Sequence, residues 1–308
     1  MINITFRQLR YFEAVARLGH FGRAADDCAI SQPALSMQIK ELEDSLGTAL
    51  FERGGRHVRL TAFGELFALR AHDILRRVEE LGDMARAAGD RLSGRLRMGI
   101  IPTVAPYLLP SLIGKLSRDY PDLDLQLRET VTPKLLTELA EGRIDTAIIA
   151  LPVSEPSLEE VALFTENFVL VRPASDANQP VPDPEHLREM RLLLLEEGHC
   201  FREQAISFCQ LGPRQPREIL DGSSLSTLVQ MVGAGIGVTL IPEMAVGVEA
   251  RSAPVSVAQF AGAQPSRTIG MVWRRSNPLA ARLAEIAEIV RVAGGELLEL
   301  NRGAAGQG

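Results

Sequence analysis

Two cysteines nine positions apart are the residues of this chain best suited to chemistry. They are Cys200 and Cys209, in the segment GHCFREQAISFC at residues 198–209. Cys200 lies between His199 and Arg202, and a helix is expected to begin there. A neighbouring cation and a helix N-terminus both favour the thiolate, which is the reactive form of cysteine. The segment therefore predicts a reactive thiol at Cys200.

The spacing of the two cysteines limits how they can react with each other. If helix covers the interval, nine residues separate them by about 13.5 Å along the axis and by about two and a half turns around it. A disulfide needs Cα atoms within about 7 Å. A Cys200–Cys209 bond would then require the helix to unfold, so such a bond would act as a conformational switch.

Simpler roles for the cysteines remain open at this point. A cysteine on an apolar helix face is usually a small core residue, and Cys209 beside Phe208 fits that role, as does Cys28 near the N-terminus. A metal site is disfavoured because Cys-x8-Cys with one adjacent histidine lacks the usual ligand spacing. Three cysteines are also too few, and odd in number, for a disulfide scaffold. We expect thiols at rest and no metal or cofactor.

The elements that position these residues begin with three predicted helices in the first sixty residues. The first follows Thr5 as N-cap and ends at Gly19, and a short second helix covers about residues 23–28. Ser31 and Pro33 are typical of the start of the third helix. Its buried stripe, at helical spacing, comprises Leu35, Ile39, Leu42 and Leu46.

The other face of the third predicted helix carries Gln32, Ser36 and Lys40, which suit a DNA groove. Two short helices joined by a tight turn, the second exposing such groups, describe a helix-turn-helix. Beyond it, residues 51–60 predict a β-ribbon wing whose Arg53 and Arg56 reach phosphates or the minor groove. A three-helix bundle with a solvated polar face is the alternative that these residues leave open.

Residues 61–88 predict one long helix with Thr61 as its N-cap. An isolated helix of this length would expose its apolar stripe to water, so we expect it to pair with a second copy. A dimer also fits a paired DNA half-site. Residues 89–94 predict a hinge. The apolar positions of the helix are Phe63, Leu66, Phe67, Leu69, Ile74, Leu75, Val78 and Leu81.

From residue 95 onward strands and helices alternate, which predicts an α/β domain with a mostly parallel sheet. Two lobes joined by crossover strands would enclose a cleft, where such folds usually bind ligands. The predicted strands are 95–101, 123–129, 145–151, 192–196, 219–221, 238–241 and 267–275, and the predicted helices lie near 106–119, 132–142, 201–210, 224–233 and 278–297.

Composition and charge place few limits on function. The net charge of −6 is unevenly distributed, because residues 1–60 carry eight basic and seven acidic side chains whereas residues 95–308 carry twenty and twenty-six. A DNA reader needs only a local basic patch, so the overall acidity excludes nothing. No apolar run reaches the ~18 residues of a membrane helix, and the N-terminus lacks the features of a signal peptide, so we expect a cytoplasmic protein.

The run AADDCAISQPALSMQIKELEDSLGTALFER, followed by LTAFGE, resembles the N-terminal signature of LysR-type transcription regulators. The GAGIGVTLIP run at 233–242 resembles their regulatory domain, and as a phosphate loop it is weak because it precedes a strand. The resemblance implies a winged helix-turn-helix at 1–60, a dimerising linker helix at 61–88, a hinge at 89–94, and a two-lobed α/β regulatory domain of periplasmic-binding-protein type at 95–308. The residues it implies at DNA are Gln32, Pro33, Ser36, Gln38, Lys40, Arg53 and Arg56.

The segments LLLLEEGHCFREQAISFC, IPTVAPYLLP at 101–110 and RTIGMVW at 267–273 are similar to the hydrogen-peroxide sensors of the LysR-type family. The similarity runs through nearly the whole chain, and residues 220–222 and 247–265 diverge from the pattern. It implies that Cys200 is the peroxidatic thiol, oxidised to sulfenic acid, and that Cys209 is the resolving thiol that closes a disulfide.

The same resemblance implies a peroxide pocket. Thr103 and Thr132 would supply hydroxyl groups around the peroxide, and His199 and Arg202 would shape the pocket. Two of these residues have simpler alternatives, because Thr132 could cap a helix that begins at Pro133 and Arg202 could be a surface ion-pair partner.

The implied partners are double-stranded DNA, hydrogen peroxide, further copies of the chain in a dimer or tetramer, RNA polymerase, and a cellular thiol reductant that resets the switch. One rival is a LysR-type regulator whose cleft binds a small organic acid while the cysteines are structural. A second is a thiol peroxidase with a DNA-binding domain, although no CxxC or nucleotide motif supplies its reductant. A third is a solute-binding protein, which the helix-turn-helix and the missing signal peptide oppose.

Overall fold

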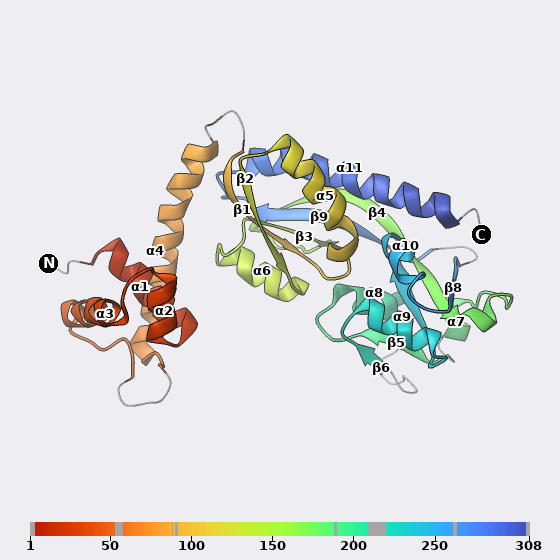
Figure 1. The fold of residues 1–308 in the computed structure, drawn as a ribbon, viewed down its shortest axis with the longest axis horizontal. Coiled ribbons are helices and arrows are strands. Elements are labelled where there is room, and N and C mark those ends of the chain that lie inside the picture. The colour runs from red at the N-terminus through yellow and green to blue at the C-terminus, as the bar shows by residue number, and fades with distance from the viewer. Residues whose placement is uncertain are drawn as a thin grey trace. The chain divides into compact units, whose positions relative to one another are not determined.

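The structure, a computed structural model of the chain, describes residues 4–52, 58–87, 89, 92–187, 190–208, 220–260 and 264–305. The chain divides into two compact units, residues 1–85 and residues 86–308. The first is mainly helical, and the second contains the β-sheet (Figure 1). None of the described helices combines the length and apolar character of a membrane span.

Local signals set the helix ends in the first unit. The side chains of Thr5 and Ser31 cap the first and third helices, as the sequence predicts. The second helix begins two residues before the predicted 23–28, because the His20 imidazole accepts a hydrogen bond from a backbone N–H in its first turn. The helices are α1 (Phe6–Leu18), α2 (Phe21–Asp27), α3 (Gln32–Leu46) and α4 (Ala62–Ala87).

Aromatic rings form the centre of the first unit's core. Phe12 is fully buried, and its ring centroid lies 5.0 Å from that of Phe67 and 5.4 Å from that of Phe51. Phe51 also forms an antiparallel β-bridge with Leu60. The bridge joins the two ends of the predicted wing, whose residues 53–57 lie outside the described residues.

α4 begins as predicted, with the Thr61 hydroxyl accepting a hydrogen bond from the Gly64 N–H at 2.9 Å. Position 64 must be glycine, because a Cβ there would lie 2.1 Å from the backbone oxygen of Leu50. Along α4 runs a series of large apolar side chains that are exposed to solvent among the described residues. These residues, called the α4 stripe below, are Phe63, Leu66, Leu69, Ile74, Val78, Leu81 and Met84.

The second unit is built on one mixed sheet with the strand order β2-β1-β3-β9-β4-β7-β5-β6, and β8 pairs with β4. The prediction of a mostly parallel sheet is wrong. β1 pairs in parallel with β2 and β3, and β5 does so with β6 and β7, but β4 and β9 run antiparallel to all their neighbours. The strands are β1 (Gly94–Ile100), β2 (Leu123–Glu129), β3 (Thr146–Leu151), β4 (Leu158–Pro173), β5 (Leu192–Leu195), β6 (Leu220–Gly222), β7 (Val238–Pro242), β8 (Val255–Ala258) and β9 (Ser266–Arg274).

Two lobes share this sheet, and β4 and β9 cross between them (Figure 1). The first lobe contains β1, β2, β3, α5 and α6, and the second contains β5, β6, β7, α8 and α9. One continuous apolar core underlies both lobes. The helices are α5 (Ala105–Asp119), α6 (Thr132–Ala140), α7 (Pro184–Leu187), α8 (Cys200–Phe208), α9 (Leu225–Gly233), α10 (Val246–Glu249) and α11 (Ala280–Ala305), with 3-10 turns η1 (Ala174–Asp176) and η2 (Glu243–Ala245).

β4 and α11 differ most from the prediction. The sequence predicts that crossover strands join the two lobes but gives no bounds for β4, which is a strand of 16 residues. α11 continues to Ala305, past the predicted end near 297. Gly294 does not end this helix. A Cβ at that position would lie 2.1 Å from the Phe164 ring, so glycine lets the helix approach β4 closely.

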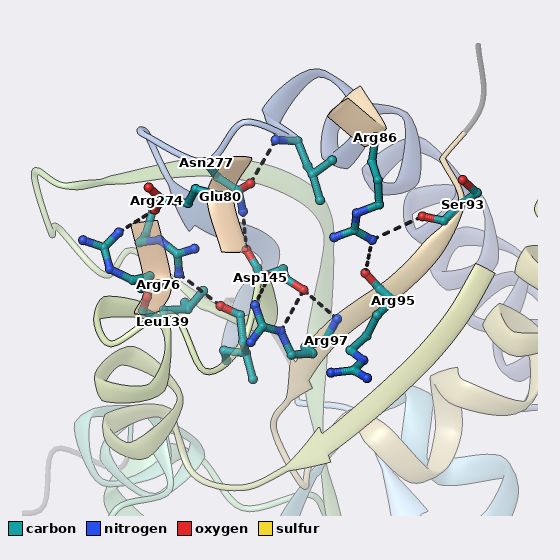
Figure 2. Close-up of polar contacts among 12 residues, drawn as sticks. Arg76, Glu80, Arg86, Ser93, Arg95, Arg97, Leu139, Asp145, Arg274 and Asn277 are labelled. Atoms are coloured by element: carbon teal, nitrogen blue, oxygen red, sulfur yellow. Dashed lines mark hydrogen bonds and ion pairs between the residues drawn. The ribbon is translucent and has the colours of Figure 1, made fainter. Parts of the chain in front are cut away.

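Polar contacts fix the amino end of β3 (Figure 2). Asp145 accepts hydrogen bonds from the backbone N–H and the guanidinium of Arg97, and the Asn277 amide donates to the Asp145 carbonyl oxygen. Arg274 donates to the carbonyl oxygen of Leu139 at the end of α6. This end of the first lobe is therefore occupied by structural contacts, which leaves the carboxyl ends of its parallel strands for a ligand.

Candidate functional site

Cys200 is the first residue of α8, and it packs half-buried against the core of the second unit as a free thiol. The chain reaches it from the carboxyl end of β5 through a turn in which Gly198 has a φ of +94°, a conformation that favours glycine. The predicted helix start at Cys200 is confirmed. The thiol therefore lies at the positive end of a helix, where partial charge favours an anion.

A hollow of about 260 Å³ lies between the two lobes, at the carboxyl ends of β1, β2 and β5. Thr103 and Thr130 line it from the first lobe, and His199 and Ser224 line it from the second. Its lining is rich in hydroxyl groups, which suits a small ligand that donates and accepts hydrogen bonds.

The residues predicted around a peroxide are not all equally close to this hollow. Thr103 and His199 line it. Cys200 directly follows His199, and Thr132 directly follows the lining residue Val131, but neither is itself among the described lining residues.

Thr132 does not cap α6, so that alternative is wrong. The helix begins at Thr132 itself, its N-cap is Val131, and no side chain caps it. The Thr132 hydroxyl oxygen is buried and forms no hydrogen bond with any described residue. Because a buried hydroxyl without a partner is costly, this oxygen is suited to receive a ligand.

His199 and Arg202 differ in what they offer the thiol. Burial lowers the pKa of His199, and the nearby Glu196 carboxylate opposes this effect, so the ring is neutral at pH 7. The Arg202 guanidinium donates to the Leu195 carbonyl oxygen and pairs with Asp221. It holds the start of α8 to β5 and β6, and it is not among the described lining residues of the hollow.

Behind the hollow lies an ion pair that the sequence did not reveal. Arg267 on β9 and Glu166 on β4 are cross-strand partners, their side chains are fully buried, and their charged atoms lie 2.8 Å apart. Arg267 also donates to the Thr103 hydroxyl at 2.8 Å and to the Thr103 carbonyl oxygen at 3.1 Å. The only sequence feature that pointed to Arg267 was the RTIGMVW segment, of which it is the first residue. No sequence feature pointed to Glu166.

Burial raises the pKa of Glu166, and the Arg267 guanidinium together with the Met244 N–H opposes that shift. Since arginine stays charged in proteins, a neutral Glu166 would leave a buried cation without its counter-charge. The pair therefore consists of a carboxylate and a guanidinium.

A second contact joins the lobes at the other side of the hollow. The Tyr107 hydroxyl of α5 donates to the buried Glu249 carboxylate of α10 at 2.7 Å, and the Ser226 hydroxyl of α9 donates to the same oxygen at 2.9 Å. Burial, followed by the hydrogen bond to Glu249, raises the pKa of Tyr107. The tyrosine thus remains a hydroxyl donor at any physiological pH.

In the first unit, α3 presents the predicted DNA-contacting face to solvent. Gln32, Pro33, Ser36 and Lys40 are exposed, while Gln38 is half-buried and donates to Glu41. The opposite face packs Leu35, Ile39 and Leu42 into the core.

Three predicted site residues lie outside the described residues: Arg53 and Arg56 of the wing, and Cys209 after α8. The remaining cysteine, Cys28, ends α2 half-buried against the core of the first unit. Burial raises the pKa of the Cys28 thiol, which fits the small core residue that the sequence predicts.

Comparison with known proteins covers both units. A model of the bacterial regulatory helix-turn-helix protein, lysR family, matches residues 6–65, and a model of the LysR substrate binding domain matches residues 89–294. The chain is 41% identical over 290 residues to the DNA-binding transcriptional dual regulator OxyR of Escherichia coli K12, with 94% of this chain and 95% of that protein covered.

Solved structures give the same picture. Full-length OxyR from Pseudomonas aeruginosa, in a mutant form, matches with a TM-score of 0.74 and 37% identity, covering 94% of this chain and 95% of that one. A mutant of Corynebacterium glutamicum OxyR with H2O2 bound matches with a TM-score of 0.68 and 35% identity, covering 98% and 96%.

Proposed function

This chain belongs to the LysR family of bacterial transcription regulators, among its OxyR-like members, and we propose that Cys200 is the residue through which it senses hydrogen peroxide. The family consists of regulators and not of enzymes. Peroxide is then a signal that each molecule consumes once per switching event, and not a substrate that it turns over.

The position of Cys200 is the observation that carries the proposal. Cys200 begins α8 and directly follows His199, which together with Thr103 lines a hollow rich in hydroxyl groups. In the first step, the Cys200 thiolate attacks one peroxide oxygen, an S–O bond forms, and the O–O bond breaks. The departing hydroxide takes up a proton and leaves as water. Cys200 becomes a sulfenic acid, oxidised by two electrons.

In the second step, the Cys209 thiol attacks the Cys200 sulfur. An S–S bond forms, the S–O bond breaks, and a second water leaves. A cellular dithiol reductant later returns both cysteines to thiols and is itself oxidised to a disulfide. α8 is helical from Cys200 to Phe208, the residue before Cys209. Because nine helical residues extend about 13.5 Å and a disulfide needs Cα atoms within about 7 Å, we infer that the second step requires α8 to unfold.

The packing of α8 indicates what this unfolding changes. Phe201 and Ala205 are buried, and the Phe208 ring lies 5.1 Å from that of Phe260, centroid to centroid. Releasing these side chains alters the surface of the second lobe. We infer that the altered surface changes how regulatory domains of neighbouring copies contact one another, and so how their helix-turn-helix units meet DNA.

The α4 stripe of the first unit supports a proposal for the assembly. The α4 stripe exposes seven large apolar side chains that a second copy would cover. We propose a dimer through α4, two dimers in a tetramer, double-stranded DNA bound through α3 and the wing, contact with RNA polymerase, and a cytoplasmic location where DNA and thiol reductants are available.

Peptide mapping after stoichiometric peroxide tests the proposal. Wild-type full-length protein should show a Cys200–Cys209 linkage, and Cys200→Ser should show none and lose its peroxide-dependent change in DNA footprint. Cys28→Ser is the matched control, and it should respond like the wild type. Cys200 and Cys209 unlinked and still alkylatable after peroxide would refute peroxide sensing. A footprint change that persists in Cys200→Ser would favour a small effector in the hollow instead.

A further inference from the structure

The hydrogen bond from Arg267 determines how the Thr103 hydroxyl can donate its own proton. Arg267 can only donate, so Thr103 Oγ1 accepts the 2.8 Å hydrogen bond between them. A hydroxyl that accepts in this way directs its own proton elsewhere. Thr103 donates that proton to no acceptor among the described residues, and it lines the hollow. The proton is therefore available to an oxygen atom that occupies the hollow.

Glu166 fixes Arg267 in this orientation. Its Nε and Nη2 both contact one oxygen of Glu166, at 2.9 and 2.8 Å. The other Glu166 oxygen accepts from the Met244 N–H at 3.1 Å. The guanidinium also lies 5.5 Å from the Phe201 ring centroid and 5.9 Å from that of Phe168, so apolar faces complete its surroundings.

The other charged groups near Glu166 leave it free to pair with Arg267. Glu243, the acidic neighbour that raises the pKa of Glu166, is held by Arg302 of α11 through two hydrogen bonds of 2.8 and 3.0 Å. Glu243 therefore has its own cation and does not compete for Arg267. The cross-strand register of β4 and β9 places Glu166 opposite Arg267.

We propose that Glu166 is a positioning residue for the peroxide reaction: it holds Arg267 so that Thr103 presents its hydroxyl proton to the peroxide oxygen that leaves. This inference rests on the proposed function, because it concerns the first step at Cys200. As the O–O bond breaks, negative charge develops on the departing oxygen, and a preoriented donor stabilises that charge. Hydrogen bonds in a chain strengthen one another, so the arginine makes the threonine a better donor.

A double-mutant cycle on the oxidation rate tests the inference. The background is full-length Cys209→Ser protein, in which the reaction stops at the sulfenic acid. The rate constant is measured with hydrogen peroxide as the only oxidant, by following trapped sulfenic acid at Cys200. Thr103→Val removes the donor, and Glu166→Gln replaces one of the two carboxylate acceptors by an amide donor. We expect each to slow oxidation about tenfold, the worth of one hydrogen bond of about 1.4 kcal/mol.

The double variant distinguishes a positioning role from a structural one. If Glu166 acts through Thr103, the double variant is slowed about tenfold, like either single variant. An oxidation rate about a hundredfold lower in the double variant, which is the sum of two independent losses, would overturn the inference. So would an unchanged background rate in the Glu166→Gln variant. Glu159→Gln is the matched control, because Glu159 is also on β4 but pairs in solvent with Arg275, the residue that follows β9. It should oxidise at the background rate.

A buried arginine without its carboxylate can prevent folding, so thermal unfolding of each variant is recorded first. If Glu166→Gln does not fold, Glu166→Asp takes its place in the cycle. Aspartate keeps the charge, but it is too short to reach Arg267 and the Met244 N–H together, and the same two outcomes decide. If Cys200 does not react in the Cys209→Ser background at all, the proposed function fails and the inference with it, whereas a reactive background with additive losses overturns the inference alone.

Discussion

Replacing Phe201 by leucine should make the proposed Cys200–Cys209 disulfide harder to reduce. Phe201 is only 2% exposed, its ring centroid lies 4.7 Å from that of Phe168 in an edge-to-face contact, and the Arg267 guanidinium lies 5.5 Å away. Leucine keeps most of the apolar contact but loses about 1 kcal/mol of aromatic pairing and about 1 kcal/mol of cation–π attraction. On the proposed mechanism, these contacts exist only while α8 is folded, which is the reduced state.

The loss of about 2 kcal/mol therefore destabilises the reduced state alone. For a two-electron couple, about 1.4 kcal/mol corresponds to 30 mV, so the reduction potential should become more negative by about 40 mV. The assay equilibrates wild type and Phe201→Leu with glutathione buffers of graded potential and quantifies the disulfide by mass spectrometry. Phe12→Leu is the control: Phe12 is equally buried and ring-paired, but it lies in the first unit. A reduced form that melts earlier while its potential stays unchanged would refute the reasoning.

Three further predictions concern other parts of the chain. Burial lowers the pKa of His199 below its usual 6.5, so the folded state binds fewer protons than the unfolded state, and the free energy of unfolding falls as the pH drops below about 6.5. His199→Gln should flatten this pH dependence in urea unfolding between pH 5 and 8. The same dependence of the unfolding free energy on pH in the variant and the wild type would contradict the prediction. The double variant Leu66→Glu/Leu69→Glu changes two positions that are 65% and 68% exposed, and it should keep its fold but sediment as a monomer in analytical ultracentrifugation. The control Arg77→Glu on the same helix should remain a dimer. A double variant that dimerises with normal affinity would count against the α4 contact. Gly64→Ala forces a Cβ to 2.1 Å from a backbone oxygen and should lower the unfolding free energy of the first unit by roughly 2–3 kcal/mol. Gly82→Ala has open space around its Cβ and should stabilise α4 by about 1 kcal/mol. Equal shifts in melting temperature for the two variants would show that the close approach at Gly64 has no effect.

Much of the fold could be predicted because its signals are local. The caps at Thr5, Ser31 and Thr61 and the α8 start at Cys200 each depend on residues within one helical turn. The two lobes also followed from alternating strand and helix patterns. β4 was not located, because its charged residues interrupt the apolar pattern that marks a buried strand.

The site could be predicted only in part, for a related reason. Cys200, Thr103 and His199 lie in recognisable segments; Thr103 and His199 line one hollow, and Cys200 directly follows His199 in the chain. The Glu166–Arg267 pair joins residues 101 positions apart. Its register depends on the antiparallel pairing of β4 and β9, which no local pattern in either segment contains.

The burial of Phe201 and Ala205 in α8 also gives the proposed switch a dependence on temperature. Unfolding this helix transfers apolar side chains to water, and such transfers have a positive heat capacity change. The free energy that opposes the disulfide is therefore a curved function of temperature, and it declines as the protein warms beyond its most stable range. At a fixed balance of peroxide and reductant, a heated cell would hold a larger fraction of this regulator in its oxidised form, so the same sensor would respond to heat as well as to oxidant.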